Sequence, residues 1–172
     1  MNPDFTVRAA SRVYIASAIL PRLVEGRRVV VVTDATIDRL YQELLSPYEK
    51  ILIGRGETIK TLQTVEQIIR RLVALGADRE CFLLAVGGGI ISDITGFVAS
   101  IYMRGVRFGF ISTTLLGQVD ASVGGKNGVN LDGYKNMVGC FTQPEFVICD
   151  PAMLRTLPER EFRAGMAEVI KA

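Results

Sequence analysis

Three consecutive glycines, Gly87, Gly88 and Gly89, form the first stretch of this 172-residue sequence that could bind a ligand. Five apolar residues (82–86) precede them and favour a strand buried on both faces, and apolar residues recur at helical spacing over 90–101. A strand, a glycine turn and a helix would offer a phosphate free N–H groups and the positive end of a helix dipole. The motif is not the Gly-x-Gly-x-x-Gly dinucleotide fingerprint, so a tight turn that binds nothing is an equal alternative.

Polar side chains stand at the ends of two other predicted strands. Asp34 follows the β-branched run 28–33, where a carboxylate is suited to ribose hydroxyls. An N-cap for the following helix explains Asp34 equally well. Thr113 and Thr114 follow the strand predicted over 107–111. Because the carboxyl ends of parallel strands share one edge of a sheet, these groups and the glycines together favour a nucleotide site over isolated turns.

Two lysines lie in glycine-rich, mostly uncharged surroundings. Lys126 belongs to the stretch 120–130, which is predicted to be a polar loop, and Lys135 follows closely. Such surroundings suit an anionic ligand better than a solvated surface does. Glu57 and Lys60 stand at the entrance of a predicted helix that runs to Leu75, where an ordinary solvated charge pair would also stand.

The elements that must position these residues alternate between strands and helices. Strands are predicted over 28–33, 51–53, 82–86, 107–111 and 146–149, and helices over 37–44, 57–75 and 90–101. A weaker pattern predicts a short strand from Phe5 to Arg8 and a helix from Val13 towards Val24. The alternation predicts an α/β fold with a Rossmann-like, mostly parallel sheet and helices on both faces.

The composition argues against several classes of protein. A net charge of +2 with interspersed signs gives no footprint for nucleic acid. Residues 82–103 are long enough to cross a membrane, but Asp93 in their middle would cost roughly 2.5–3.5 kcal/mol, so we expect no span. Without any histidine, this chain alone cannot assemble a zinc hydrolase site or a histidine-based triad.

The three cysteines, Cys81, Cys140 and Cys149, form no Cys-x-x-Cys pair. An odd number also fits a disulfide framework poorly. With no apparent signal peptide, we expect free thiols in a reducing cytoplasm.

A last helix is predicted from Pro158, and it continues to Ala172 without a capping signal. Its composition is helical rather than strand-rich. We therefore expect an α/β domain over 1–151 and, over 152–172, the beginning of a helical domain that the chain does not contain.

Three segments form a pattern that is hard to obtain by chance: 87–93 with 102–108, then 113–126, then 135–144 followed by 157–161 and 167–171. Together they closely resemble the 3-dehydroquinate synthase family of sugar-phosphate cyclases. The resemblance is dense from about residue 56 to the end and thin before it. The Lys-Asn-Met-x-Gly phrase at 135–139 and the Ala-Glu-Val-Ile-Lys phrase at 167–171 favour the dehydroquinate branch.

The resemblance implies an NAD-binding α/β domain followed by an all-helical domain with a catalytic zinc or cobalt. It further implies a cytoplasmic, homodimeric carbon–oxygen lyase of the shikimate pathway that acts on a small sugar acid phosphate. In that family NAD removes a hydride from a ring hydroxyl, the ketone acidifies the neighbouring C–H so that phosphate is eliminated, and the hydride is returned.

Carried over residue by residue, the resemblance implies three sets of positions. The cofactor set is Asp34, Glu57, Lys60, Gly88, Gly89, Ile90, Asp93, Thr113, Thr114, Leu116, Lys135 and Thr156. The substrate set, for its carboxylate and phosphate, is Arg104, Asp120, Lys126, Asn136 and Lys171. Glu168 matches one metal ligand; the family's other ligands are histidines, which this chain lacks.

Three positions depart from the family pattern: Ser92 replaces glycine, Asn127 replaces threonine, and Thr36 replaces an asparagine that helps to hold the adenosine. Two alternatives stay open. One is a sister cyclase that makes valiolone or deoxyinosose rings. The other is a stand-alone nucleotide-binding module with a regulatory or partner-binding role.

Overall fold

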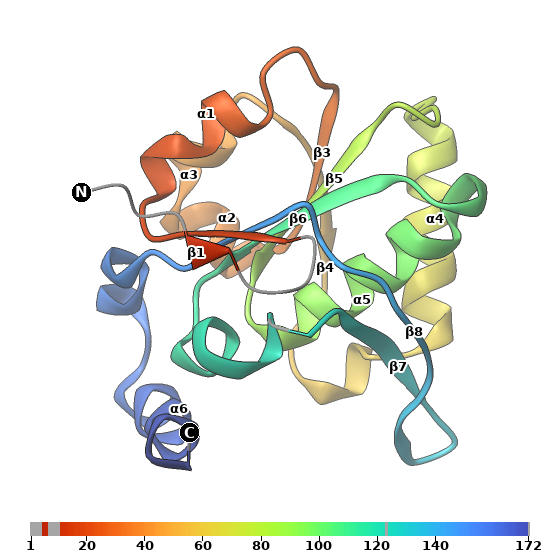
Figure 1. Cartoon of the computed structure of the whole chain (residues 1–172). Coiled ribbons are helices and arrows are strands. Elements are labelled where there is room, and N and C mark those ends of the chain that lie inside the picture. Colours follow the sequence, from red (N-terminus) through yellow and green to blue (C-terminus); the bar gives the residue numbers. More distant parts are fainter. Residues whose placement is uncertain (1–4, 7–10, 123, 172) are drawn as a thin grey trace.

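A seven-stranded sheet forms the centre of the computed structural model, which describes residues 5–6, 11–122 and 124–171 (Figure 1). The strand order is β1-β2-β9-β6-β5-β3-β4. The strands of this sheet are β1 (Phe5–Thr6), β2 (Arg12–Tyr14), β3 (Val29–Asp34), β4 (Glu49–Ile53), β5 (Phe82–Gly87), β6 (Arg107–Ser112) and β9 (Phe146–Ile148). Within this sheet, as far as the structure describes it, only the β1–β2 pair is antiparallel. The predicted mostly parallel sheet is confirmed.

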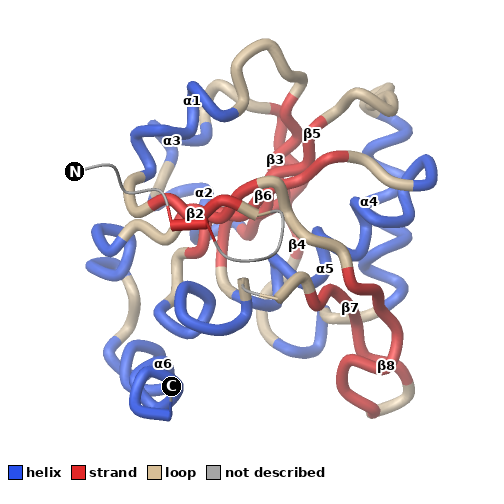
Figure 2. Tube along the Cα trace, viewed as in Figure 1, coloured by secondary structure: helices blue, strands red, loops and turns tan. Residues whose placement is uncertain are grey.

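Helices cover both faces of this sheet, as predicted (Figure 2). The helices α1 (Leu20–Leu23), α2 (Ala35–Leu40) and α3 (Gln42–Leu45) pack on one face, and α4 (Leu62–Ala74) and α5 (Gly89–Ile101) pack on the other. The strands β3 and β5 lie inside the sheet and are buried along their whole lengths. Their continuous apolar runs are therefore explained by burial on both sides.

The N-terminal helix predicted from Val13 is wrong over its first half. Residues 12–14 form β2, and a short 3-10 helix (Ser17–Ile19) precedes α1. Tyr14 is buried and pairs with Ile148 of β9, so sheet pairing outweighs the weak helical pattern. Of the strand predicted from Phe5 to Arg8, β1 confirms the first two residues, and Arg8 lies outside the described residues.

The predicted polar loop over 120–130 is also wrong. A π-helix (Gly117–Ala121) is followed by a hairpin of β7 (Lys126–Leu131) and β8 (Tyr134–Phe141). Gly128 serves strand pairing, because it lies opposite Gly139, while Gly124 and Gly125 lie before β7 with positive φ (99° and 66°). A Cβ on Gly128 would meet the Val138 carbonyl oxygen at 2.6 Å.

Two predicted helices are interrupted in the structure. The helix expected over 37–44 is divided into α2 and α3 at Tyr41, whose backbone is not helical (φ −118°, ψ 34°). The helix expected over 57–75 begins with a 3-10 turn (Glu57–Ile59), and α4 starts only after Thr61. The Thr61 hydroxyl accepts a hydrogen bond from the Thr64 N–H at 3.2 Å and so caps α4.

The chain's last described helix, α6 (Glu159–Lys171), follows a 3-10 helix (Pro151–Thr156) and packs against the π-helix segment. Its contact is close at Gly165, and much of its apolar surface is open to solvent, including Ile170, which is 81% exposed. The division into domains 1–151 and 152–172 stays a prediction. Among the described residues, no helix is both long and apolar enough to cross a membrane.

Candidate functional site

The start of α5 lies where β5 and β6 end side by side. Gly88 is the N-cap of α5 and supplies no side-chain hydrogen bond to the first turn. The Thr113 N–H donates to the Gly87 carbonyl at 2.9 Å, which ties the two strand ends together. A Cβ on Gly88 would meet the Thr114 methyl at 3.0 Å, so glycine lets these ends approach closely. The helix therefore presents an N-terminus that no side chain caps, which fits an anion.

Thr113 adds a second ligand-binding feature at this edge. The residue is 3% exposed, and its hydroxyl has no hydrogen-bond partner among the described residues. A buried hydroxyl without a partner costs about 1–3 kcal/mol, which a bound ligand would offset. Thr114 differs, because its hydroxyl accepts a hydrogen bond from the Gly117 N–H at 3.1 Å.

Asp34 acts as the N-cap of α2. One of its carboxylate oxygens accepts hydrogen bonds from the N–H groups of Thr36 (2.7 Å) and Ile37 (3.2 Å). Arg55 lies beside it, with 3.7 Å between its Nε and the same oxygen, and also donates to the Thr36 hydroxyl at 3.1 Å. The capping alternative is confirmed, and a contact with ribose stays a prediction.

Lys60 is not part of a solvated charge pair with Glu57. It is 5% exposed, and its ammonium lies 2.5 Å from the Asp93 carboxylate and 2.6 Å from the Asn136 carboxamide oxygen. These partners come from α5 and from β8, so one lysine connects the loop before α4 with both elements. Buried charges are retained only when they are paired in this way.

The pKa of Asp93 is raised above the usual carboxyl range. Burial is the main cause, and the hydrogen bond and positive charge of Lys60 oppose it. The negative charges of Glu57 and Asp120 raise the pKa of Asp93 further. The site therefore holds a carboxyl group that binds its proton more tightly than an exposed aspartate does.

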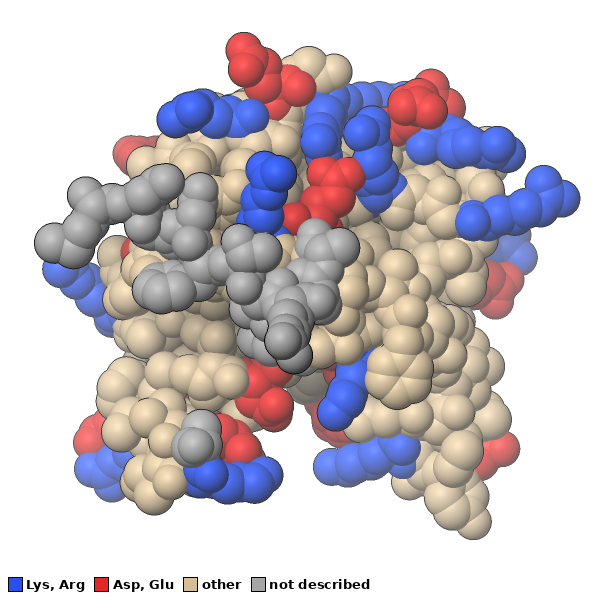
Figure 3. Space-filling view, viewed as in Figure 1, with Lys and Arg blue, Asp and Glu red and all other residues tan. Residues whose placement is uncertain are grey.

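A cavity of ≈ 500 Å³ lies between α5, the π-helix and the hairpin. In the space-filling view the surface is hollowed between α6 and the hairpin, with acidic and basic side chains around the hollow (Figure 3). The cavity brings together four residues predicted for the site: Asp93, Asp120, Lys126 and Asn136. Its other lining residues are Ala121, Asn127, Gly128, Met137, Gly139, Cys140 and Phe141. Sequence reasoning found Asn136 but missed Met137, Cys140 and Phe141 on β8, since it did not predict the hairpin that contains them.

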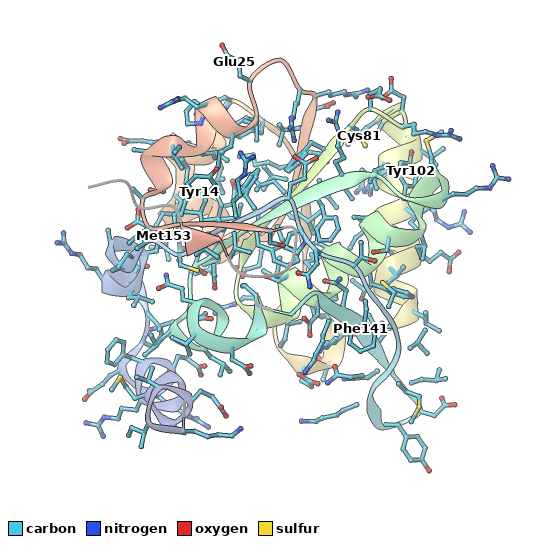
Figure 4. All side chains as sticks on the ribbon, viewed as in Figure 1. Tyr14, Glu25, Cys81, Tyr102, Phe141 and Met153 are labelled. Atoms are coloured by element: carbon cyan, nitrogen blue, oxygen red, sulfur yellow. The ribbon has the colours of Figure 1, made fainter. Side chains whose placement is uncertain are left out.

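Arg104 lies apart from this cavity. It is exposed in the turn that ends α5, in the left-handed region with φ 69°, and just before β6 begins. That turn is at the amino edge of the sheet, opposite the strand ends described above. Figure 4 labels Tyr102, in the same turn, far from Phe141 on the hairpin. Within one chain Arg104 therefore does not join the other predicted substrate contacts.

Lys171 and Thr156 also lie outside the cavity. Lys171 is exposed on α6 and donates to the Glu168 carboxylate at 3.2 Å. The Thr156 hydroxyl is 2.6 Å from the Tyr41 hydroxyl, so it contacts the segment between α2 and α3. Both residues belong to the segment that follows β9, and neither lines the cavity.

The remaining predicted cofactor residues differ in their surroundings. Gly89 packs closely on the π-helix, because a Cβ there would meet the Ala121 Cβ at 2.8 Å. Leu116 is 40% exposed, and Lys135 and Glu57 are exposed too. Ile90, in the first turn of α5, packs partly buried against the core. Their exposure leaves these side chains accessible to a ligand.

The described residues do not form a metal site by themselves. No group of three or more His, Cys, Asp or Glu side chains gathers among them, and Glu168 has only Lys171 as an ionic partner there. The three cysteines are free thiols, as predicted, and burial raises the pKa of Cys149 to about 11. A metal would need further ligands from outside this part of the chain.

Two residues that depart from the family pattern, Asn127 and Ser92, lie in packed parts of the structure. Asn127 donates from its amide nitrogen to the carbonyls of Gly125 (3.0 Å) and Thr142 (2.8 Å), which joins the two ends of the hairpin. Its carboxamide oxygen approaches Gly96 of α5. Ser92 is fully buried on the same helix. Both substitutions thus lie within packed structure rather than in open loops.

A parallel α/β sheet with an uncapped helix N-terminus and a polar cavity at its carboxyl edge defines a Rossmann-like ligand-binding domain. The family model of the 3-dehydroquinate synthase N-terminal region matches residues 50–164. This chain belongs to the 3-dehydroquinate synthase family.

Individual proteins agree with that assignment. The 3-dehydroquinate synthase of Sulfurovum sp. (strain NBC37-1) is 50% identical over 158 residues, which is 88% of this chain and 45% of that protein. The chain spans about half the length of the curated relatives it matches.

Two solved cyclases share the fold. The 2-epi-5-epi-valiolone synthase ValA from Streptomyces hygroscopicus subsp. jinggangensis 5008, with NAD+ and Zn2+ bound, has a TM-score of 0.85 at 34% identity and covers 97% of this chain and 50% of its own. A 2-deoxy-scyllo-inosose synthase, complexed with carbaglucose-6-phosphate, NAD+ and Co2+, has a TM-score of 0.83 at 29% identity. The match covers 94% of this chain and 48% of the synthase.

Proposed function

We propose that this chain is the cofactor-binding part of a cytoplasmic 3-dehydroquinate synthase. The whole enzyme is a carbon–oxygen lyase of the shikimate pathway. It converts 3-deoxy-D-arabino-heptulosonate 7-phosphate into 3-dehydroquinate and phosphate. The observation that carries the proposal is the cavity at the carboxyl edge of the sheet. There Asp93, Asp120, Lys126 and Asn136, all matched to family positions, come together.

The carboxyl edge fits NAD, which when bound supplies a reversible hydride acceptor. The N–H groups at the start of α5 would bind its pyrophosphate, because Gly88 leaves them without a side-chain cap. The Thr113 hydroxyl would gain the hydrogen bond that it lacks among the described residues. NAD-bound structures of two cyclases with the same fold support this assignment. Further contacts are proposed for Asp34, Glu57, Lys60, Gly89, Ile90, Thr114, Leu116, Lys135 and Thr156.

The cavity also suits an anionic substrate. The Lys126 ammonium and the Asn136 carboxamide would bind a carboxylate or phosphate of the sugar acid. Asp93 lies on the same wall, and its raised pKa makes it a stronger base than an exposed aspartate. Lys60 holds this carboxylate in place, and Asp93 is proposed as a further contact to the cofactor.

The rest of the site would come from outside this chain. Glu168 would supply one ligand to a zinc or cobalt ion. The other ligands would come from a second half of the protein, which corresponds to the part of the relatives that this chain does not span. Residues 152–172 would then begin a helical domain that contains those ligands. Lys171, beside Glu168, would face the substrate once that domain is in place.

A homodimer is the proposed state of the whole enzyme. Arg104 matches a substrate-binding position, yet it lies at the opposite edge of the sheet from the cavity. Such a residue can reach substrate only by entering the site of a second copy.

The direct test uses the full-length protein with NAD and zinc, and measures phosphate release from 3-deoxy-D-arabino-heptulosonate 7-phosphate. We expect turnover, and we expect Lys126→Met to reduce kcat/KM at least about a hundredfold, because it removes a charged contact to an anion. NAD binding without turnover on any sugar phosphate would contradict the proposal and favour a nucleotide-binding module.

A sister cyclase is the second candidate, since the two solved cyclases with the same fold make other rings. The same assay with glucose 6-phosphate separates the candidates, because a carbocyclic analogue of that sugar phosphate is bound in the inosose synthase structure. Release from glucose 6-phosphate in place of the heptulosonate would favour the sister cyclase.

A further inference from the structure

Asn130 forms hydrogen bonds with three different segments. It lies half-buried near the end of β7. Its backbone N–H donates to the Lys60 carbonyl at 2.8 Å, and its side-chain amide donates to the Glu57 carboxylate at 2.8 Å. Its carboxamide oxygen accepts from the Asn136 N–H at 2.9 Å. The residue thus connects the proposed cofactor contacts before α4 with a proposed substrate contact on β8.

An irregularity in the hairpin makes these bonds available. Val129 pairs with Val138 and Leu131 pairs with Tyr134, but the register shifts between them. At Asn130 the backbone of β7 turns away from β8 and forms a parallel bridge with Thr61 instead. The Asn130 side chain then takes the place of a ladder acceptor for the Asn136 N–H.

The bonds close into a ring of three residues. The Lys60 carbonyl binds the Asn130 N–H, the Asn130 carboxamide binds the Asn136 N–H, and the Asn136 carboxamide accepts from the Lys60 ammonium at 2.6 Å. Asn136 is therefore fixed at both its backbone and its side chain. Asn136 needs this support because its backbone is in the left-handed region (φ 53°) in an exposed part of the hairpin.

We propose that Asn130 is a positioning residue, which holds Asn136 in register with Glu57 and Lys60 so that substrate and cofactor meet in the correct geometry. This role rests on the proposed function above. Asn130 acts through Asn136 and through the loop before α4, and it need not touch either ligand.

Three variants test the ring. Asn130→Ala removes both side-chain bonds. Asn130→Asp keeps the acceptor for the Asn136 N–H but sets a carboxylate against Glu57. Adding Glu57→Gln to Asn130→Asp restores a donor–acceptor pair with the roles exchanged, and Glu57→Gln alone is the reference that accounts for any lost cofactor contact. Leu131→Ala, at the exposed neighbouring position, is the control for general loosening of the hairpin.

The first measurement is amide hydrogen exchange at Asn136 in the chain described here. We expect exchange at least about tenfold faster in Asn130→Ala, the size set by one lost hydrogen bond, and unchanged in Leu131→Ala. Unchanged exchange in Asn130→Ala would overturn the proposal.

The second measurement is phosphate release by the full-length enzyme, corrected for the folded fraction. We expect kcat/KM to fall about tenfold in Asn130→Ala and in Asn130→Asp, and to return in Asn130→Asp/Glu57→Gln to the value of Glu57→Gln alone. If exchange accelerates while kcat/KM stays at the wild-type value, Asn130 is only structural and the proposal is wrong. If the wild type releases no phosphate, the proposed function fails and the positioning role fails with it, although the exchange measurement still shows whether the ring exists.

Discussion

At the level of single residues, the carboxyl edge of the sheet contains groups whose bonding is incomplete or unusually buried. The Thr113 hydroxyl has no hydrogen-bond partner in the part of the chain that the structure describes, and Lys60 is a buried ammonium shared by two partners. Buried polar groups of this kind in a native structure are explained by a ligand or by a neighbouring element that uses them. Each leads to a specific expectation.

Thr113→Val should weaken NAD binding without destabilising the fold. Valine has nearly the same shape but lacks the hydroxyl, which has no partner within the described chain, so the free energy of unfolding should not fall. We expect the Kd for NAD, measured by titration calorimetry, to rise about fivefold to tenfold.

Thr95→Val is the matched control for Thr113→Val. The Thr95 hydroxyl is also buried and has no partner among the described residues, but it lies in the second turn of α5. Equal NAD affinity in wild type and Thr113→Val would remove this hydroxyl from the site.

Lys60→Met should destabilise the chain in a pH-dependent way. It leaves the largely buried Asp93 carboxylate without its ammonium, at a cost of about 3 kcal/mol near neutral pH. The folded-state pKa of Asp93 is already raised, and losing Lys60 raises it further. A raised carboxyl pKa contributes stability below the unfolded value, 3.8, and loses that contribution as pH rises through the folded value.

The deficit of Lys60→Met should therefore shrink as the pH falls from about 7 to about 4. Urea unfolding of both proteins at several pH values measures it. A deficit that is constant over this range would mean that Asp93 is not the group left uncompensated.

Site residues could be predicted from the sequence where they lie at the ends of strands. Gly88, Thr113 and Asp34 follow apolar runs whose ends the sequence marks clearly, and the structure places all three at the carboxyl edge. The role of Asn130 was not predictable in the same way. It depends on a register shift in a hairpin, and local sequence does not specify which backbone groups a bulge leaves unpaired.

At the level of elements, the buried strands and their helices follow from hydrophobic pattern, while the π-helix and the hairpin do not. Glycines at 124, 125, 128 and 139 look like loop residues in sequence. Two of them allow β7 and β8 to lie in close contact, a property of the pair of strands rather than of either segment. Tertiary contact thus decides the structure of the segment that contributes most of the cavity wall.

Gly165 determines how α6 docks. A Cβ there would meet the Leu115 Cβ at 2.7 Å and the Leu116 backbone nitrogen at 2.8 Å, so Gly165→Ala should push α6 away from the π-helix segment. Alanine favours an isolated helix by about 1 kcal/mol, but the clash includes backbone that cannot move aside, so we expect a net loosening.

Hydrogen exchange over residues 159–171 measures this loosening. We expect exchange in Gly165→Ala to accelerate more than in Ala164→Ser, which alters an exposed position on the same helix and changes helix propensity alone. Slower exchange in Gly165→Ala would show that helix propensity outweighs the contact.

At the level of the whole molecule, the described chain presents two exposed apolar surfaces on either side of its cavity. One is on α6, where Phe162, Val169 and Ile170 are exposed, and the other is on the hairpin, where Met137 and Phe141 are exposed. Exposed apolar surface next to a ligand cavity is typical of a face that another domain covers. The relatives contain a further half that this chain does not span, and that half is the proposed occupant.

Metal binding and activity should therefore require both halves. A catalytic zinc site needs about three protein ligands and an open position, and Glu168 alone cannot provide them. We expect the 172-residue chain to bind no stoichiometric zinc and to release no phosphate, even with NAD. Adding the second half of the protein in trans should restore both, and metal analysis beside a phosphate-release assay measures them.

Two variants of α6 distinguish the proposed metal ligand from the proposed substrate contact. In the two-part complex, Glu168→Ala should lose the metal, because it removes a ligand. Lys171→Ala should keep the metal and lose turnover, because its ammonium is proposed to bind the substrate. In the structure these side chains contact each other at 3.2 Å, so one substitution alters the surroundings of both, yet only Glu168 can coordinate a cation. Tight zinc in the 172-residue chain alone would show that the metal site lies elsewhere.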